Sequence, residues 1–250
     1  MDEPPPERAP GKRLALVIGA SGGIGRAISD ALIERGEADH VVGLCRSAPW
    51  PAGAQRSWLP LDLTDEAGIA AAAPRVAALG APSSVIVASG LLHAEGVTPE
   101  KTYRALSAEA MAALFAVNAI GPTLVAKHML PIMPRRGRST FAVLSARVGS
   151  IQDNRLGGWY GYRASKAALN MLVHSLAIEH RRTHPEAVCV ALHPGTVRTA
   201  LSAPFRSEEK GGAGLLDPPR SAQALLDVLA GLTPANSGGF FAWDGAPIPW

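Results

Sequence analysis

Short apolar runs alternate along the chain with segments of helical periodicity, and this alternation limits the fold more than any other feature. The runs are continuous and do not alternate with polar residues, which is typical of strands buried on both faces of a parallel sheet. The pattern therefore predicts an α/β fold, a doubly wound parallel sheet of about seven strands with helices on both faces. The expected strands are 14–18, 41–45, 85–88, 140–145, 188–192 and 239–243, and the expected helices are 24–35, 65–79, 108–133, 160–182 and 222–232.

The 250 residues are predicted to form a single domain, because 47% hydrophobic content at that length suffices for one buried core. Residues 1–12 are polar and proline-rich and are expected to be a disordered tail, so that the domain spans 13–250. Glycines, prolines and charges interrupt the pattern near 200–219. We expect a mobile substrate loop there, and the alternative is a surface loop without a ligand role.

The net charge of +3 does not indicate a nucleic-acid partner, because the one local cluster, Arg135, Arg136 and Arg138, surrounds a glycine and contains no aromatic side chain. The N-terminus lacks the apolar segment of a signal peptide, and no run of 18 residues is expected to span a membrane. Cys45 and Cys189 lie in apolar runs as free thiols, and the histidines lack metal-ligand spacing. We therefore expect a cytoplasmic protein with no metal site, no nucleic-acid partner and no membrane partner.

A glycine-rich loop lies between the first expected strand and the first expected helix. It contains Gly19, Gly23 and Gly25, with Ser21 and Ile24 between them. Glycines let the backbone turn tightly and approach a pyrophosphate, and the helix that follows directs free N–H groups at the phosphates. Because the loop opens the first strand-helix unit, these five residues predict a Rossmann-type dinucleotide site.

Arg46 follows the second expected strand and bears on which dinucleotide binds. A carboxylate at this place accepts hydrogen bonds from the ribose hydroxyls of NAD, whereas an arginine suits the 2′-phosphate of NADP. The sequence supplies Arg46 and no acid, which predicts NADP(H) as the cofactor. The alternative is a solvated charge at the end of a strand.

Tyr162 and Lys166 are four residues apart at the start of an expected helix, so their side chains project from the same side. A carbonyl that accepts a hydride must be protonated, and a phenol can donate that proton. An ammonium about 4 Å away contributes on the order of 4 kcal/mol, which corresponds to roughly three pKa units. The pair therefore predicts a catalytic acid, Tyr162, whose pKa is lowered by Lys166.

These features resemble the short-chain dehydrogenase/reductase family. The resemblance depends on the spacing Gly-x-x-x-Gly-x-Gly, on the Tyr-x-x-x-Lys pair and on the motif Pro-Gly-x-Val-x-Thr at 194–199, and it covers 13–250. The segments 150–160 and 243–250 resemble a narrower branch, the C-factor-like members.

The resemblance implies roles for further residues. Asp62 and Leu63 would contact adenine, Gly90 would lie in a turn against the cofactor, and Lys166 would bond the nicotinamide ribose. Asn118 would hold a water for proton relay through the lysine; alternatively it is a polar residue at a helix kink. The segment that surrounds the nicotinamide would contribute Pro194, Gly195, Val197 and Thr199.

One departure from the family concerns its substrate-binding serine. Relatives usually show Ser-Ser-x-x-Gly, but alignment on Gly149 puts Ala146 in the place of the second serine. We expect Ser145 to replace it, with Ser150 as the second choice and neither as the third. Trp159 either lines the substrate entrance or packs against a neighbouring helix.

The function predicted from these residues is that of an NADP(H)-dependent oxidoreductase, which interconverts a ketone or aldehyde with an alcohol. A small-molecule carbonyl or alcohol would be the substrate. The alternative is an NADP(H)-binding signalling or regulatory protein of the same fold with little or no turnover. A homodimer or homotetramer that pairs through 108–133 and 160–182 is expected from the resemblance.

Overall fold

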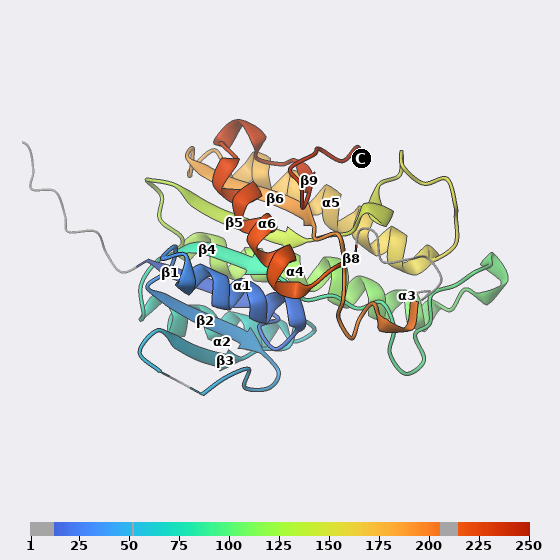
Figure 1. Cartoon of the computed structure of the whole chain (residues 1–250), viewed down its shortest axis with the longest axis horizontal. Helices are drawn as coiled ribbons and strands as arrows, with labels where there is room; N and C mark the ends of the chain where they lie inside the picture. The colour runs from blue at the N-terminus through green and yellow to red at the C-terminus, as the bar shows by residue number, and fades with distance from the viewer. Residues whose placement is uncertain (1–12, 52, 206–214) are drawn as a thin grey trace, which may run out of the picture.

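The computed structural model describes residues 13–51, 53–205 and 215–250, and its centre is a seven-stranded parallel sheet (Figure 1). The strand order is β3-β2-β1-β4-β5-β6-β9, which confirms the predicted doubly wound fold. The next two strands of the chain, β2 and β3, lie on one side of β1, whereas β4 and the later strands of this sheet lie on the other side. The strands are β1 (Leu14–Ile18), β2 (His40–Cys45), β3 (Arg56–Pro60), β4 (Pro82–Val87), β5 (Ser139–Leu144), β6 (Ala187–His193) and β9 (Phe240–Ala242).

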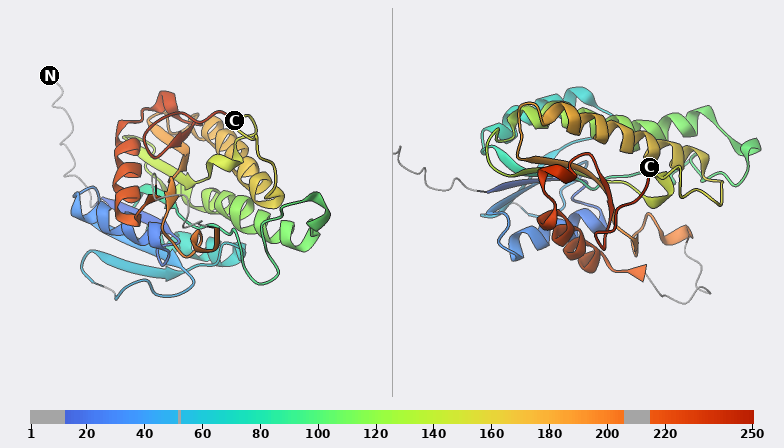
Figure 2. Two further views of the ribbon diagram at one scale, coloured as in Figure 1. Left: turned by 45° about the vertical axis from the view of Figure 1, so that its right-hand side comes forward. Right: turned by 90° about the horizontal axis from the view of Figure 1, so that it is seen from above.

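Helices cover both faces of this sheet (Figure 2). Two of them, α1 (Gly23–Glu34) and α6 (Pro218–Gly231), pack on one face together with Trp50. The other face is covered by α2 (Glu66–Ala77), α4 (Gly121–Met129) and α5 (Tyr160–His180). Each face thus has its own apolar core, as expected for continuous apolar strands.

The edge strand β3 has no counterpart among the strands expected from the sequence. It pairs in parallel with β2 over Arg56–Pro60, but only Leu59 of its five residues is buried. A strand at the edge of a sheet has one unpaired side and needs few apolar residues. Its sequence therefore lacks the continuous apolar run that marks the inner strands.

The segment 108–133 is not one regular helix. It contains α3 (Ala108–Phe115), a π-helical turn (Ala116–Ile120), α4 and a 3₁₀ turn (Leu130–Ile132). The whole segment Ala108–Ile132 is long and apolar enough to cross a membrane, by length and composition only. Leu114, Val125 and Met129 are nevertheless buried within this chain, as in the core helix of a globular protein.

The expected loop near 200–219 contains structured parts. Its end includes β8 (Leu215–Leu216), which pairs with β7 (Thr196–Val197), and the first turn of α6. The helix begins at Pro218, four residues earlier than expected, because Asp217 caps it by accepting a hydrogen bond from Arg220 N at 2.8 Å. The expected mobility of 206–214 and the expected tail 1–12 lie outside the described residues.

Two buried histidines stack on each other at the end of α5. The ring centroids of His180 and His184 are 3.9 Å apart, and the two residues are 7% and 6% exposed. Neither Nε2 atom has a hydrogen-bond partner in the described part of the chain. Burial, and to a smaller extent the charge of His184, lowers the pKa of His180 to about 4.

We predict that the free energy of unfolding decreases as the pH falls from about 6.5 to about 4. In this range the unfolded chain binds a proton on His180 that the folded chain does not, so acid favours the unfolded state. The variant His180→Gln cannot titrate and should show a shallower decrease. Urea denaturation at a series of pH values measures it; equal slopes for wild type and variant would contradict the assignment.

Candidate functional site

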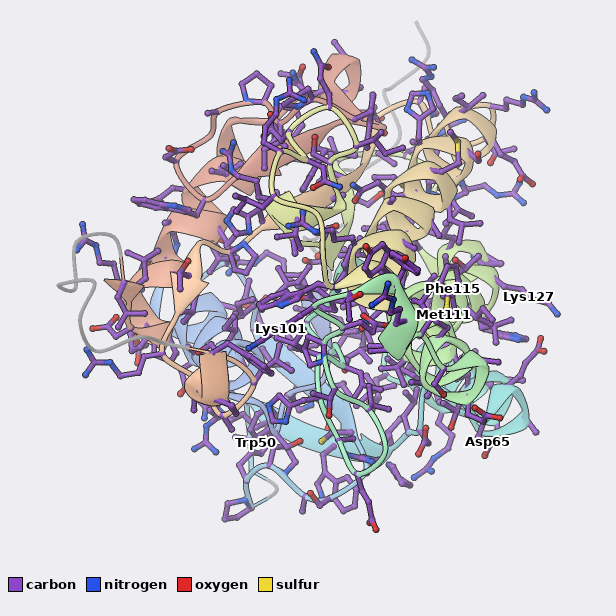
Figure 3. The ribbon with its side chains drawn as sticks, turned by 90° about the vertical axis from the view of Figure 1, so that its right-hand side faces the viewer. Trp50, Asp65, Lys101, Met111, Phe115 and Lys127 are labelled. Atoms are coloured by element: carbon purple, nitrogen blue, oxygen red, sulfur yellow. The ribbon has the colours of Figure 1, made fainter. Side chains whose placement is uncertain are left out.

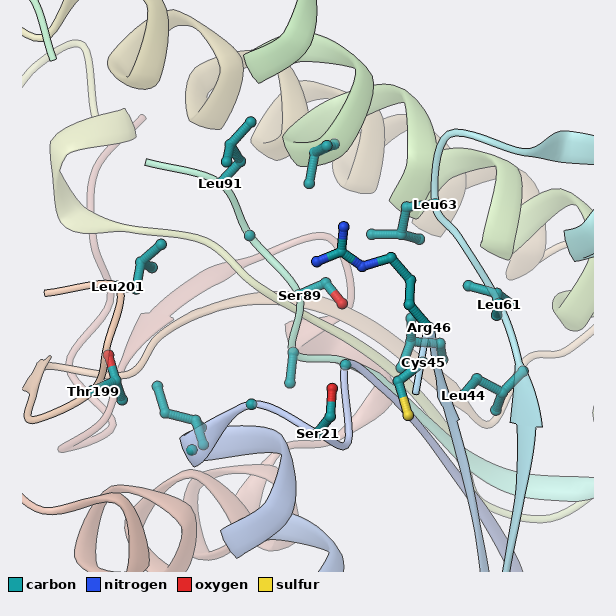
Figure 4. A pocket seen from close by; sticks show the side chains of 18 of the residues that line it. Ser21, Leu44, Cys45, Arg46, Leu61, Leu63, Ser89, Leu91, Thr199 and Leu201 are labelled. Atoms are coloured by element: carbon teal, nitrogen blue, oxygen red, sulfur yellow. The ribbon is translucent and has the colours of Figure 1, made fainter. Parts of the chain in front are cut away.

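A cleft of about 340 Å³ opens at the carboxyl ends of β1, β2 and β4, where the strand order reverses (Figure 4). Open α/β sheets bind ligands at this place. Nine of the residues predicted to hold the cofactor line the cleft. They are Gly19, Ser21, Gly23, Ile24, Arg46, Asp62, Leu63, Gly90 and Thr199.

The glycine loop between β1 and α1 has no room for a side chain at Gly19 or Gly25. Gly19 has a φ of +85°, and a Cβ there would lie 2.4 Å from Ser89 Oγ. Gly25 does not line the cleft, and a Cβ there would lie 2.3 Å from the carbonyl oxygen of Gly19. No side chain caps α1 and its first turn carries no acid, so its positive end is open to an anion. These features fit the pyrophosphate of a dinucleotide.

Arg46 extends its side chain into the cleft (Figure 4) and is its charged group at the end of β2. Asp62 is the acid among the described lining residues, and its Oδ1 accepts hydrogen bonds from Thr64 N at 2.9 Å and Thr64 Oγ1 at 2.7 Å. These bonds, and to a smaller extent the Arg46 charge, lower the pKa of Asp62. The Asp62 carboxylate is thus held by its own turn.

Asn118 is fully buried in the π-helical turn and joins three segments. Its Oδ1 accepts from Leu91 N at 2.7 Å, while its Nδ2 donates to Leu91 O at 2.8 Å and to Ser165 Oγ at 3.1 Å. Leu91 lines the cleft and Ser165 belongs to α5. The amide of Asn118 therefore fixes the loop after β4 against the helix that carries Tyr162.

Lys166 and Tyr162 are buried together on α5, at 3% and 8% exposure. The Nζ of Lys166 donates to Leu144 O at 2.8 Å and lies 5.9 Å from the centre of the Tyr162 ring. A Cβ on Gly90 would be 3.6 Å from this Nζ and 3.6 Å from Asn118 Oδ1. The structure thus brings Gly90, Asn118 and Lys166 together beside the cleft.

Burial dominates the electrostatics of this pair. It raises the pKa of Tyr162 to about 12 and lowers the pKa of Lys166 to about 8. The expected lowering of the Tyr162 pKa by Lys166 is not found, because burial of the phenol raises this pKa instead. The Tyr162 hydroxyl is therefore protonated at neutral pH and can serve as a proton donor.

The start of α5 depends on Glu100, which the sequence did not single out. The Glu100 carboxylate, 4% exposed, accepts from Gly161 N at 3.3 Å, and its backbone oxygen accepts from Trp159 N at 2.5 Å. A Cβ on Gly161 would lie 2.8 Å from Leu114 and 3.4 Å from Met111 of α3, which Figure 3 labels. The hydrogen bond from Gly161 to Glu100 joins residues that are 61 positions apart in the chain, so no local sequence pattern predicts it.

The residues considered for the missing serine lie in different directions. Ser145 Oγ donates to Asn170 Oδ1 at 2.6 Å inside the core, and Ser150 Oγ accepts from Asp153 N at 3.1 Å. Ala146 packs against the apolar cluster that contains Tyr162. Since neighbouring residues of an extended chain face opposite sides, Ser145 and Ala146 point apart. The catalytic role of Ser145 stays a prediction.

The segment 194–199 connects β6 with the region of α6. Pro194 O accepts from Ser221 Oγ at 2.8 Å, Gly195 has a φ of +80°, and Val197 is buried in β7. Thr199 lines the cleft, while Pro194, Gly195 and Val197 do not, and neither does Gly25. No group of three or more potential metal ligands occurs in the described residues, whether around His193 or elsewhere in them.

Comparison with known proteins decides the family. The model of the family described as short chain dehydrogenase matches residues 13–210. The chain belongs to this family. Among curated proteins, C-signal of Myxococcus xanthus is 40% identical over 141 residues, which cover 56% of this chain and 78% of that protein. The 1-hydroxy-2-glutathionyl-2-methyl-3-butene dehydrogenase of Rhodococcus sp. is 29% identical over 94% of this chain and 98% of its own.

Solved structures agree with this assignment. The NADPH-bound carbonyl reductase from chicken fatty liver has 28% identity and a TM-score of 0.81, with 96% of this chain and 94% of that chain covered. As a short-chain dehydrogenase, the protein is an oxidoreductase that acts on a small molecule with a nicotinamide cofactor. The resemblance inferred from the sequence is thereby confirmed, including a C-factor-like relative.

The close approach at Gly25 yields a test of the cofactor cleft. We predict that Gly25→Ala weakens NADPH and NADH binding at least about tenfold, because the new methyl group displaces the Gly19 carbonyl and with it the phosphate loop. Gly231→Ala is the matched control, since nothing lies within 4 Å of a Cβ there. Equal dinucleotide affinity of the two variants in a fluorescence titration would contradict the assigned loop.

Proposed function

We propose that this short-chain dehydrogenase is an NADP(H)-dependent carbonyl reductase that interconverts a ketone or aldehyde with an alcohol. The observation that carries the proposal is the buried pair Tyr162 and Lys166, because the Lys166 Nζ lies 3.6 Å from the place of a Cβ on Gly90, and Gly90 lines the dinucleotide cleft. A nicotinamide dinucleotide bound there supplies or accepts the hydride. The activities for which the chicken carbonyl reductase and the Rhodococcus dehydrogenase are named support the same reaction class.

The proposed roles follow from the geometry. Tyr162 donates its hydroxyl proton to the substrate oxygen, so that a carbonyl, a hydride and a proton together give an alcohol. Lys166 lies over the Tyr162 ring and, with a pKa lowered to about 8, can exchange a proton near neutral pH. Asn118 acts through others, because its amide holds Leu91 and Ser165 in place.

The assignment of the proton donor predicts the effect of Tyr162→Phe. Turnover should fall at least about 100-fold, since general acid catalysis contributes that much. NADPH affinity should stay near that of the wild type, which separates loss of chemistry from loss of the fold. Full turnover in steady-state assays of NADPH oxidation with a panel of ketones and aldehydes would refute the mechanism.

The preference for NADP(H) is proposed from Arg46. It is the charged residue at the end of β2 that lines the cleft, and a guanidinium can bind the 2′-phosphate. We predict that Arg46→Ala raises the Kd of NADPH about 10- to 100-fold, the loss of roughly 1.5–3 kcal/mol for a charged hydrogen bond. The Kd of NADH should be unchanged. A wild-type preference for NADH would exclude the assignment.

The missing family serine gives a further prediction. If Ser145 binds the substrate oxygen, Ser145→Ala lowers kcat roughly ten- to hundredfold, which is the effect of one hydrogen bond to a developing alkoxide. Ser150→Ala is the comparison variant, because its hydroxyl accepts from a loop amide. Small and equal effects on kcat would show that neither serine serves the substrate.

A second candidate function is a signalling or regulatory protein that binds NADP(H) with little or no turnover. Two observations favour it. One is the similarity to C-signal, and the other is that Ala146, where relatives usually carry a serine, packs against the cluster that contains Tyr162. Tight NADPH binding without NADPH oxidation over a broad carbonyl panel would support it.

We further propose that the protein forms a homodimer or homotetramer, since Ile120, Met171 and Ile178 are exposed apolar side chains on the outer helices. We propose a cytoplasmic location as well.

A further inference from the structure

We propose that Trp159, Phe205 and His93 form a binding site for a flat aromatic group of the substrate, next to Tyr162. We call these three residues the aromatic wall. The inference rests on the proposed reductase function and names its substrate class: ketones and aldehydes whose carbonyl carries an aromatic ring.

The aromatic wall is a continuous series of ring contacts that ends on the proton donor. The Trp159 ring lies 6.2 Å from Tyr162 at 72°, and the Phe205 ring lies 5.3 Å from Trp159 at 64°. The His93 ring lies 5.4 Å from Phe205 at 63°. These edge-to-face contacts come from three separate segments, the loop after β4, the start of α5 and a 3₁₀ turn at Ala203–Phe205. A flat aromatic ring of a substrate can pack edge-to-face against these rings in the same way.

The wall is contiguous with the cofactor cleft. Leu91 and Leu201 both line the cleft, and both pack against the cluster of Tyr162 and Leu92 that includes Trp159. A substrate ring held at the wall would therefore place its carbonyl between Tyr162 and the cleft. Ala146 packs against the same cluster and adds no polar group to it, so a substrate ring would have apolar surroundings on this side.

The backbone of Trp159 supports a role beyond packing. Its φ of +52° makes it the one non-glycine residue with a positive φ among those described. A large side chain in this conformation is strained, and strain of this kind persists where the surrounding structure imposes it. Here Glu100 O holds the Trp159 amide at 2.5 Å, and two glycines of left-handed conformation, Gly157 and Gly158, precede it. The strained turn directs the indole onto Tyr162.

His93 gives the wall one polar group. Its Nε2 atom is buried and has no hydrogen-bond partner within the described ranges. A buried ring nitrogen without a partner is costly, and a polar substituent on the substrate ring would satisfy it once the side chains that cover the nitrogen move aside. The wall therefore fits an aromatic carbonyl compound better than an aliphatic one of the same reactivity.

The experiment compares benzaldehyde with propanal as substrates of the wild type and of Trp159→Leu and Phe205→Leu. In both variants kcat/KM for benzaldehyde should fall about tenfold relative to that for propanal, mostly through KM, since ring contacts are lost while the proton donor remains. Tyr103→Leu is the control, because Tyr103 is an aromatic residue that is 63% exposed. An equal fall for both aldehydes would overturn the aromatic wall and leave a structural role.

A second measurement separates this proposal from the reductase function. Acetophenone binding to enzyme loaded with NADP⁺, which cannot reduce it, is followed by quenching of tryptophan fluorescence. The wild type should bind acetophenone about tenfold more tightly than Phe205→Leu. If binding shows this difference but no aldehyde is reduced, the reductase function fails while the aromatic wall stands. Equal binding by wild type and variant overturns the wall.

Discussion

The hydrogen bonds of the Asn118 amide hold the site together. Its Oδ1 accepts from the N–H of Leu91, and its Nδ2 donates to the carbonyl oxygen of Leu91 and to Ser165 Oγ. The loop at the cleft, the π-helical turn and the catalytic helix are therefore fixed at one point. Because Asn118 is fully buried, each of these bonds forms away from competing water. Without this amide, the backbone groups of Leu91 would lose their partners, and the distance between cleft and Lys166 would not be set.

Local spacing predicts much of this molecule, because the decisive features are short-range. The glycine loop and the Tyr162–Lys166 pair each occupy one turn or one helix start, so their geometry follows from the sequence. The inner strands are apolar because both of their faces are covered, which makes them recognisable. The fold class, most of the helices and nine lining residues could be predicted for these reasons.

Other features depend on contacts between residues that are far apart in the chain, and no local sequence pattern predicts them. The edge strand β3 lacks an apolar run, since only one of its sides is paired. The π-helical turn contains Asn118, whose partners Leu91 and Ser165 lie 27 and 47 residues away in the chain. Glu100 is an unremarkable acid in the sequence, yet it is buried at the start of α5. The expected lowering of the Tyr162 pKa was wrong for a similar reason, because burial, which depends on distant parts of the chain, raises this pKa.

The bond from Trp159 to Glu100 links the reactive tyrosine to a loop far away in the chain. The sheet, with its two apolar cores, does not depend on that bond, whereas the first turn of α5 does. Proteins open locally in cooperative units of unequal stability, and a segment held by a few polar contacts opens at lower cost than a core strand. Opening of the segment around Glu100 would misplace Tyr162 while leaving the dinucleotide cleft intact. The folded protein would then keep its cofactor bound but lose its reactivity.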